Sequence, residues 1–93
     1  MNNEYLLQQI IVFYQNDFQS YDGTNKDELR LVLLELIIEI TRYVHGFRYC
    51  SKVECSCSPE SRIRGLANKY HKEFCELFKL EIGLLKFLED FHD

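Results

Sequence analysis

The sequence predicts an all-α protein with a single helical domain over residues 1–93. Apolar residues recur at helical spacing along most of the chain, and residues that start and stop helices stand at the ends of these stretches. The pair Ile37-Ile38 would tolerate a strand, but it lies inside a long uninterrupted stretch with caps. The 46% hydrophobic and 14% aromatic content is enough for one packed core. We expect a compact three- or four-helix bundle with a cysteine-containing loop between the second and third helices.

The first helix is predicted from about residue 3 to residue 18. Its apolar side chains repeat at helical spacing and are Leu7, Ile10, Ile11, Tyr14 and Phe18. Residues 19–24 form a polar break that contains the turn dipeptide Asp22-Gly23. The second helix then begins, because Asn25 with Glu28, or Thr24 with Asp27, has the spacing of a capping box.

The second helix is apolar around most of its circumference between Leu29 and Val44. Leu31, Leu34 and Ile38 widen its apolar face beyond the width that one neighbour covers. Such a helix is either central in a bundle or part of a homodimer interface. Its polar wedge holds Glu28, Glu35, Glu39 and Arg42, and we expect Glu35 and Glu39 to form a solvated stripe.

A loop over residues 47–57 separates the second helix from the last helical stretch. Gly46 is expected to end the second helix. Ser58-Pro59-Glu60 restarts the helix, because serine caps, proline suits the first helical position and glutamate suits the positive end. If the stretch were continuous to Phe91 it would be on the order of 50 Å long. Gly83 is the expected place for a break.

Four cysteines and one histidine are the residues that suggest chemistry. Cys50, Cys55 and Cys57 lie in the loop, and Cys75 comes one helical turn after His71. Thiolate sulfur and imidazole nitrogen are the usual ligands of tetrahedral zinc, and structural sites use four of them. Residues four apart share a helix face. We therefore expect Cys55, Cys57, His71 and Cys75 to bind a structural zinc ion, with Cys50 as an alternate ligand.

The spacing of these residues leaves alternatives open. It is not the doubled Cys-x2-Cys pattern of strong zinc motifs, and reduced thiols also pack as small apolar side chains. A third alternative is a thiol redox sensor, in which Cys75 pairs with a loop cysteine and Cys57 is the reactive thiol. His45, at the end of the second helix, is a further candidate metal ligand.

The net charge of −4 is unevenly distributed along the chain. Residues 1–47 carry −4, residues 48–72 carry +4 and residues 73–93 carry −4. Arg62, Arg64, Lys69 and Lys72 form a basic segment that could contact a partner, and Phe47 and Tyr49 beside the loop could join it. Nucleic-acid binding through residues 62–72 is an alternative, but a short basic segment on an acidic protein favours a solvated face or charges that balance the thiolates. An acidic protein surface could use the same segment.

The sequence predicts no enzyme, because no arrangement of catalytic residues stands out. It predicts a small protein-binding module, such as an adaptor, an inhibitor or a regulatory subunit. The N-terminus lacks the basic region of a signal peptide, and no run reaches the roughly 18 apolar residues of a membrane span. We therefore expect a cytoplasmic protein whose thiols stay reduced.

Overall fold

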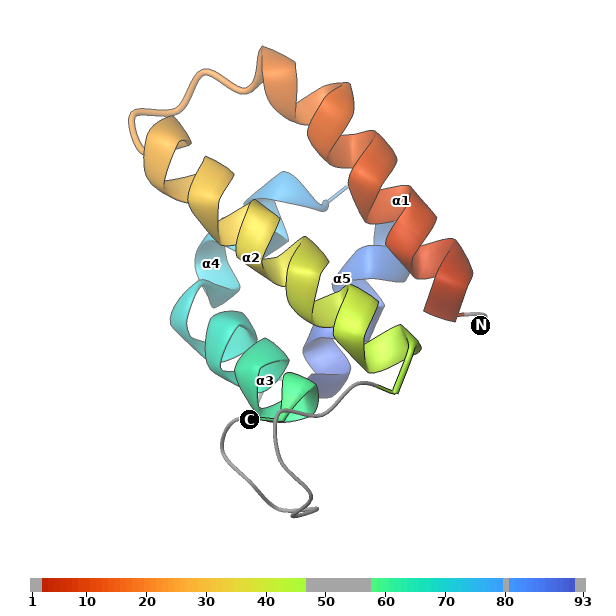
Figure 1. Cartoon of the computed structure of the whole chain (residues 1–93). Helices are drawn as coiled ribbons and strands as arrows, with labels where there is room; N and C mark the ends of the chain where they lie inside the picture. Colours follow the sequence, from red (N-terminus) through yellow and green to blue (C-terminus); the bar gives the residue numbers. More distant parts are fainter. Residues whose placement is uncertain (1–2, 47–57, 80, 92–93) are drawn as a thin grey trace.

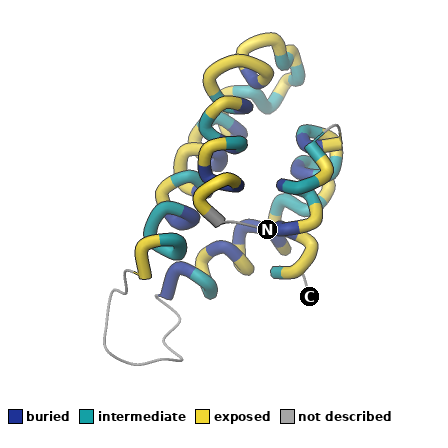
Figure 2. Tube along the Cα trace, turned by 90° about the vertical axis from the view of Figure 1, so that its right-hand side faces the viewer, coloured by how far each residue is buried: buried dark blue, intermediate teal, exposed yellow. Residues whose placement is uncertain are grey.

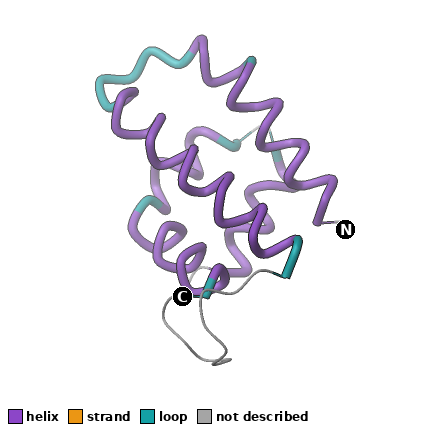
Figure 3. Tube along the Cα trace, in the orientation of Figure 1, coloured by secondary structure: helices purple, strands orange, loops and turns teal. Residues whose placement is uncertain are grey.

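The computed structural model describes residues 3–46, 58–79 and 81–91, and every regular element among them is helical (Figure 3). In chain order the elements are α1 (Asn3–Gln15), the 3-10 helix η1 (Asp17–Ser20), α2 (Lys26–Val44), α3 (Pro59–Lys69), α4 (His71–Leu77) and α5 (Ile82–Phe91). The all-α prediction is therefore confirmed. The described residues form five α-helices, more than the three or four that were predicted. The predicted cysteine loop lies outside them.

The longer helices pack against one another in neighbouring pairs. α1 and α2 run side by side in opposite directions, and α2 also packs on α3 (Figure 1). α5 contacts both α1 and α3, while the short α4 follows α3. The result is compact, with a Cα radius of gyration of 12.9 Å. Among the residues with described positions, no helix has the length and apolar character needed to cross a membrane.

The first helix ends earlier than the sequence predicts. α1 stops at Gln15, and the chain tightens into η1, which turns Phe18 into the core. The Phe18 ring stacks between Tyr14 and Tyr21, with ring centroids 5.9 and 5.7 Å apart. The tighter turn therefore serves to bury an aromatic side chain at the end of α1.

The two ends of α2 test two sequence predictions. The predicted capping box of Asn25 is not formed, because its side chain makes no cap hydrogen bond and instead accepts one from the Tyr21 hydroxyl at 2.9 Å. The predicted stop at Gly46 is confirmed. α2 ends at Val44, and Gly46 has a φ of +70°, in the left-handed region that favours glycine.

The last helical stretch starts as predicted but breaks elsewhere. Ser58 caps α3 by accepting a hydrogen bond from the Ser61 amide at 3.2 Å, and Pro59 is the first helical residue. The helix is interrupted at Tyr70 and again after Leu77, whereas Gly83 lies inside α5. A continuous helix of about 50 Å would exceed the 41 Å longest dimension of the molecule. The breaks return the apolar stripe to the core.

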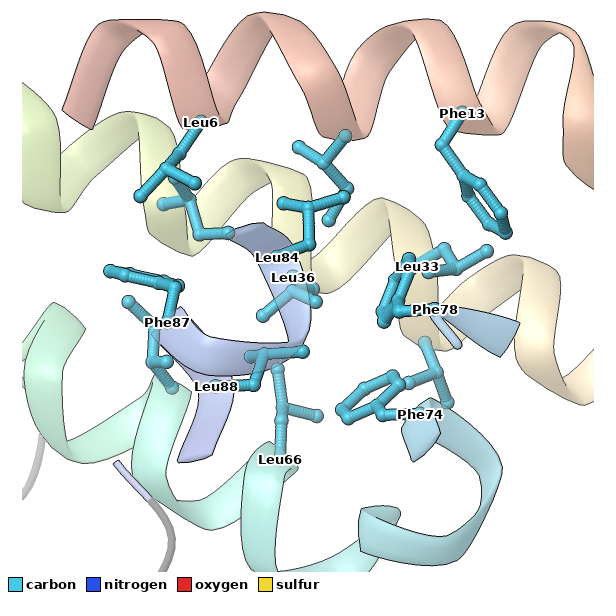
Figure 4. Packing of buried hydrophobic residues seen from close by; sticks show 14 of the residues in the cluster. Leu6, Phe13, Leu33, Leu36, Leu66, Phe74, Phe78, Leu84, Phe87 and Leu88 are labelled. Carbon is cyan, nitrogen blue, oxygen red and sulfur yellow. The ribbon is translucent and has the colours of Figure 1, made fainter. Parts of the chain in front are cut away.

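One apolar core joins all five helices and η1. Buried residues line the inward sides of the elements, and exposed residues lie outside (Figure 2). Phe78 is fully buried after α4, and its ring lies 4.9 Å from Phe13 of α1 and 5.7 Å from Phe74 of α4 (Figure 4). These aromatic contacts connect the α1–α2 pair to the second half of the chain.

Candidate functional site

The predicted metal site is only partly within the described residues. Cys50, Cys55 and Cys57 lie outside them. His71 and Cys75 are both half-buried on α4, and the Nε2 atom of His71 lies 3.6 Å from the Sγ atom of Cys75. Cys75 carries a free thiol. The structure therefore brings together the two predicted helix ligands.

The separation of these two atoms suits a shared metal ion. Zinc–sulfur and zinc–nitrogen bonds of about 2.3 and 2.1 Å at a tetrahedral angle place the two ligand atoms about 3.6 Å apart. The same distance also suits a weak hydrogen bond between thiol and imidazole. Within residues 3–46, 58–79 and 81–91, no group of three or more metal-ligating side chains converges. His45 ends α2 as an exposed residue.

The predicted basic segment does not form one face. Arg62 and Lys69 are seven residues apart and share a side of α3, whereas Arg64 lies about 200° around the helix from Arg62. Lys72 belongs to α4, and the Nζ atom of Lys69 lies 5.3 Å from the centre of the Tyr70 ring. Phe47 and Tyr49 are outside the described residues. The basic side chains are exposed but spread over different sides of two helices.

Glu39 is the one charged residue that the sequence analysis misplaced. It is only 2% exposed, so it does not belong to a solvated stripe with Glu35. Its Oε2 atom lies 3.6 Å from Arg42 of α2 and 3.7 Å from Arg62 of α3. Burial raises the pKa of Glu39 above its ordinary 4.5, while Arg42 and Arg62 lower it and Glu35 adds to the rise. The α2–α3 seam therefore contains a buried carboxylate with its own cations.

The outward face of α2 is apolar. Leu31, Leu34 and Ile38 are 68%, 38% and 48% exposed, on the side of the helix opposite the core residues Leu33 and Leu36. Their i, i+3, i+7 spacing aligns them in one stripe. We call these three residues the α2 stripe. The sequence predicts that α2 needs cover on more than one side. The described part of the chain leaves the α2 stripe uncovered.

A groove follows α1 on the side of the α4–α5 connection. A hollow of about 490 Å³ lies between Phe13, Asp17 and Tyr21 on one side and Glu76 and Glu81 on the other. A second hollow of about 300 Å³ shares Phe13, Asp17 and Glu81 and continues along α1. The residues that line either hollow define the α1 groove, and they are Tyr5, Gln8, Gln9, Val12, Phe13, Asp17, Ser20, Tyr21, Glu76, Leu77, Lys79 and Glu81.

The α1 groove is acidic and incompletely paired. Lys79 is the one basic residue among its described lining residues and already lies 3.2 Å from Glu76. The carboxylates of Asp17 and Glu81 form no ion pair or side-chain hydrogen bond with any described residue. The groove therefore offers negative charge to a ligand.

Sequence reasoning missed the α1 groove and Glu39, and the signals for both were weak. The glutamine pair Gln8-Gln9 interrupts the apolar pattern of α1, and both residues line the groove. Asp17 is far from Glu76 and Glu81 in the sequence, and they meet only through the turns after α1 and α4. The groove is therefore a product of the tertiary fold.

Comparisons with known proteins add nothing to this geometry. No family model, no curated protein and no solved structure matches the chain. The functional argument consequently depends on the chemistry of the residues themselves.

Proposed function

We propose that the chain is a small non-enzymatic protein-binding module. The observation that carries this proposal is the α2 stripe, in which three large aliphatic side chains stand opposite the core. Leu31 alone is 68% exposed. Burying such side chains against another protein contributes roughly 1.5–3 kcal/mol each when it is complete. A surface of this kind acts by covering a partner.

The partner that best fits the α2 stripe is a second copy of the chain. Asp27 lies four residues before Leu31, and Arg42 lies four residues after Ile38. An antiparallel pairing that sets Leu31 opposite Ile38 of the copy therefore also sets Asp27 of each copy opposite Arg42 of the other. The Asp27 side chain is 98% exposed and its 3.6 Å ion pair with Arg30 is a surface contact, so it is free to reorient. A parallel pairing would oppose like charges.

Sedimentation equilibrium over about 10 µM to 1 mM tests the pairing, because a small interface gives micromolar or weaker affinity. We expect a monomer–dimer equilibrium that Leu31→Glu abolishes. Ile82→Glu is the matched control, since Ile82 is 74% exposed on α5, away from the stripe. Glu35 lies near the two-fold axis of this pairing, so Glu35→Gln should tighten the dimer. A strictly monomeric wild type at the highest concentration would contradict the pairing.

We further propose that a structural zinc ion stabilises this module through His71 and Cys75. The 3.6 Å separation of their ligand atoms supports the proposal. The predicted remaining ligands, Cys55 and Cys57 with Cys50 as alternate, belong to the loop. Metal content per chain, measured by native mass spectrometry on protein purified without chelator, should be one zinc. Cys75→Ser should lower zinc affinity, and a metal-free wild type with four titratable thiols would contradict the site.

A further inference from the structure

We infer that the α1 groove binds an arginine-bearing segment of a partner protein. This inference deepens the proposed function by naming the chemistry of the partner. It rests on the chain being a protein-binding module, but it does not use the α2 stripe.

The charges of the groove call for a cationic ligand. Three carboxylates, those of Asp17, Glu76 and Glu81, face one lysine that is already paired with Glu76. Asp17 and Glu81 line both hollows, so their charge lies where the two meet. A guanidinium group binds carboxylates through two parallel hydrogen bonds, whereas an ammonium acts as a point charge. Two carboxylates without described partners therefore favour arginine.

The apolar lining determines that the ligand is a segment rather than a single side chain. The Phe13 ring packs against Phe78 (Figure 4). Tyr5 and Val12 are half-exposed farther along α1. The helix extends about 15 Å between Tyr5 and its end at Gln15, and Asp17 follows in η1. That length accommodates several residues of an amphipathic peptide, with apolar side chains on Phe13 and Val12 and arginine near Asp17 and Glu81.

A titration followed by ¹⁵N-NMR tests the inference with a defined probe. The probe is a synthetic amphipathic peptide of leucine and arginine, and its control is the same peptide with citrulline, a neutral isostere, in place of arginine. We expect the arginine peptide to shift the amide signals of Gln9, Phe13, Asp17 and Glu81. The citrulline peptide should bind at least about tenfold more weakly.

Two charge-matched double variants separate local recognition from long-range attraction. Asp17→Asn with Glu81→Gln should weaken binding of the arginine peptide about tenfold. Glu89→Gln with Asp90→Asn removes the same charge from exposed positions on α5 and should change binding less than about twofold. Equal weakening by both pairs, or equal binding of the two peptides, would overturn the inference.

The same titration on the Leu31→Glu variant distinguishes this inference from the proposed dimer. Binding of the arginine peptide to that variant supports the groove even if the wild type proves monomeric. Dimerisation with no groove shifts would overturn the groove alone. Loss of both would remove the protein-binding function as a whole.

Discussion

The α2–α3 seam and the α1 groove both place carboxylates beside apolar helix faces, but they differ in how those carboxylates are paired. In the seam, Glu39 is buried and lies within 3.7 Å of both Arg42 and Arg62. In the groove, Lys79 pairs with Glu76, and the carboxylates of Asp17 and Glu81 form no ion pair with any described residue. The seam carboxylate is compensated within the chain, and two groove carboxylates are open to a ligand.

This difference indicates which of the two regions is structural. A carboxylate removed from water is costly unless hydrogen bonds and opposite charge compensate it. Two arginines provide that compensation for Glu39, so the seam can close and join α2 to α3. In the groove, Asp17 and Glu81 have no such compensation from a described residue, and the groove remains an open hollow of about 490 Å³. We therefore place binding at the groove and stability at the seam.

The largest effect on this comparison should come from Phe78→Ala. The ring contacts Phe13 beneath the groove and Phe74 in the core, so its loss removes packing beneath the groove and not at the α2–α3 seam. We expect a loss of roughly 3–5 kcal/mol in the free energy of unfolding, measured with urea. Since the free energy of unfolding of a small domain is only about 5–15 kcal/mol, partial unfolding would follow. Ile82→Ala, at an exposed position, should change stability by less than about 0.5 kcal/mol.

The next largest effect should come from removing the cations of the seam. Arg42→Met with Arg62→Met keeps the long unbranched stems but leaves Glu39 as a buried carboxylate without these charges. We expect a loss of roughly 1–3 kcal/mol at pH 7, because both arginines are more than a third exposed and the seam is partly hydrated. Adding Glu39→Gln to the double variant should recover most of that loss. No recovery would show that the arginines act through other contacts.

The pH dependence of this variant follows from the direction of the Glu39 pKa. Burial already raises the folded pKa above 4.5, so the folded state binds the proton more tightly than the unfolded state. The stability contributed by that proton is present below pH 4.5 and is lost as pH rises through the folded pKa. Without the two arginines the folded pKa rises further. The difference in unfolding free energy between the double arginine variant and the wild type should therefore narrow as the pH falls towards 4.5. A difference that widens would contradict this account.

Local signals predicted the helices well and their lengths less well. The Ser58-Pro59 start and the Gly46 stop are confirmed because each depends on neighbouring backbone groups. The break expected at Gly83 was wrong, because α5 tolerates a glycine near its start and the chain turns where Phe78 enters the core. Helix propensity is a weak local preference that core packing overrides.

Candidate sites could be predicted only where their residues are close in sequence. His71 and Cys75 face each other as their spacing predicts, since four residues make about one helical turn. The sequence predicted Glu39 in solvent, and this prediction was wrong. Arg62 approaches Glu39 from another helix, which no spacing on α2 reveals. The α1 groove likewise combines Asp17 with Glu76 and Glu81, which are distant in the sequence. Whether the loop cysteines bind zinc stays a prediction.

The smallest effect should come from Gln9→Leu, and it tests the groove half of the comparison. Leucine keeps the helix propensity and removes the buried oxygen that has no described donor. We expect a gain of about 1 kcal/mol in the free energy of unfolding, because a buried acceptor without a described donor is removed. Gln15→Leu, at an exposed position outside the groove, should change stability by less than about 0.5 kcal/mol. If Gln9→Leu instead left the stability unchanged, the oxygen would already be satisfied, and this side of α1 would resemble the self-sufficient seam.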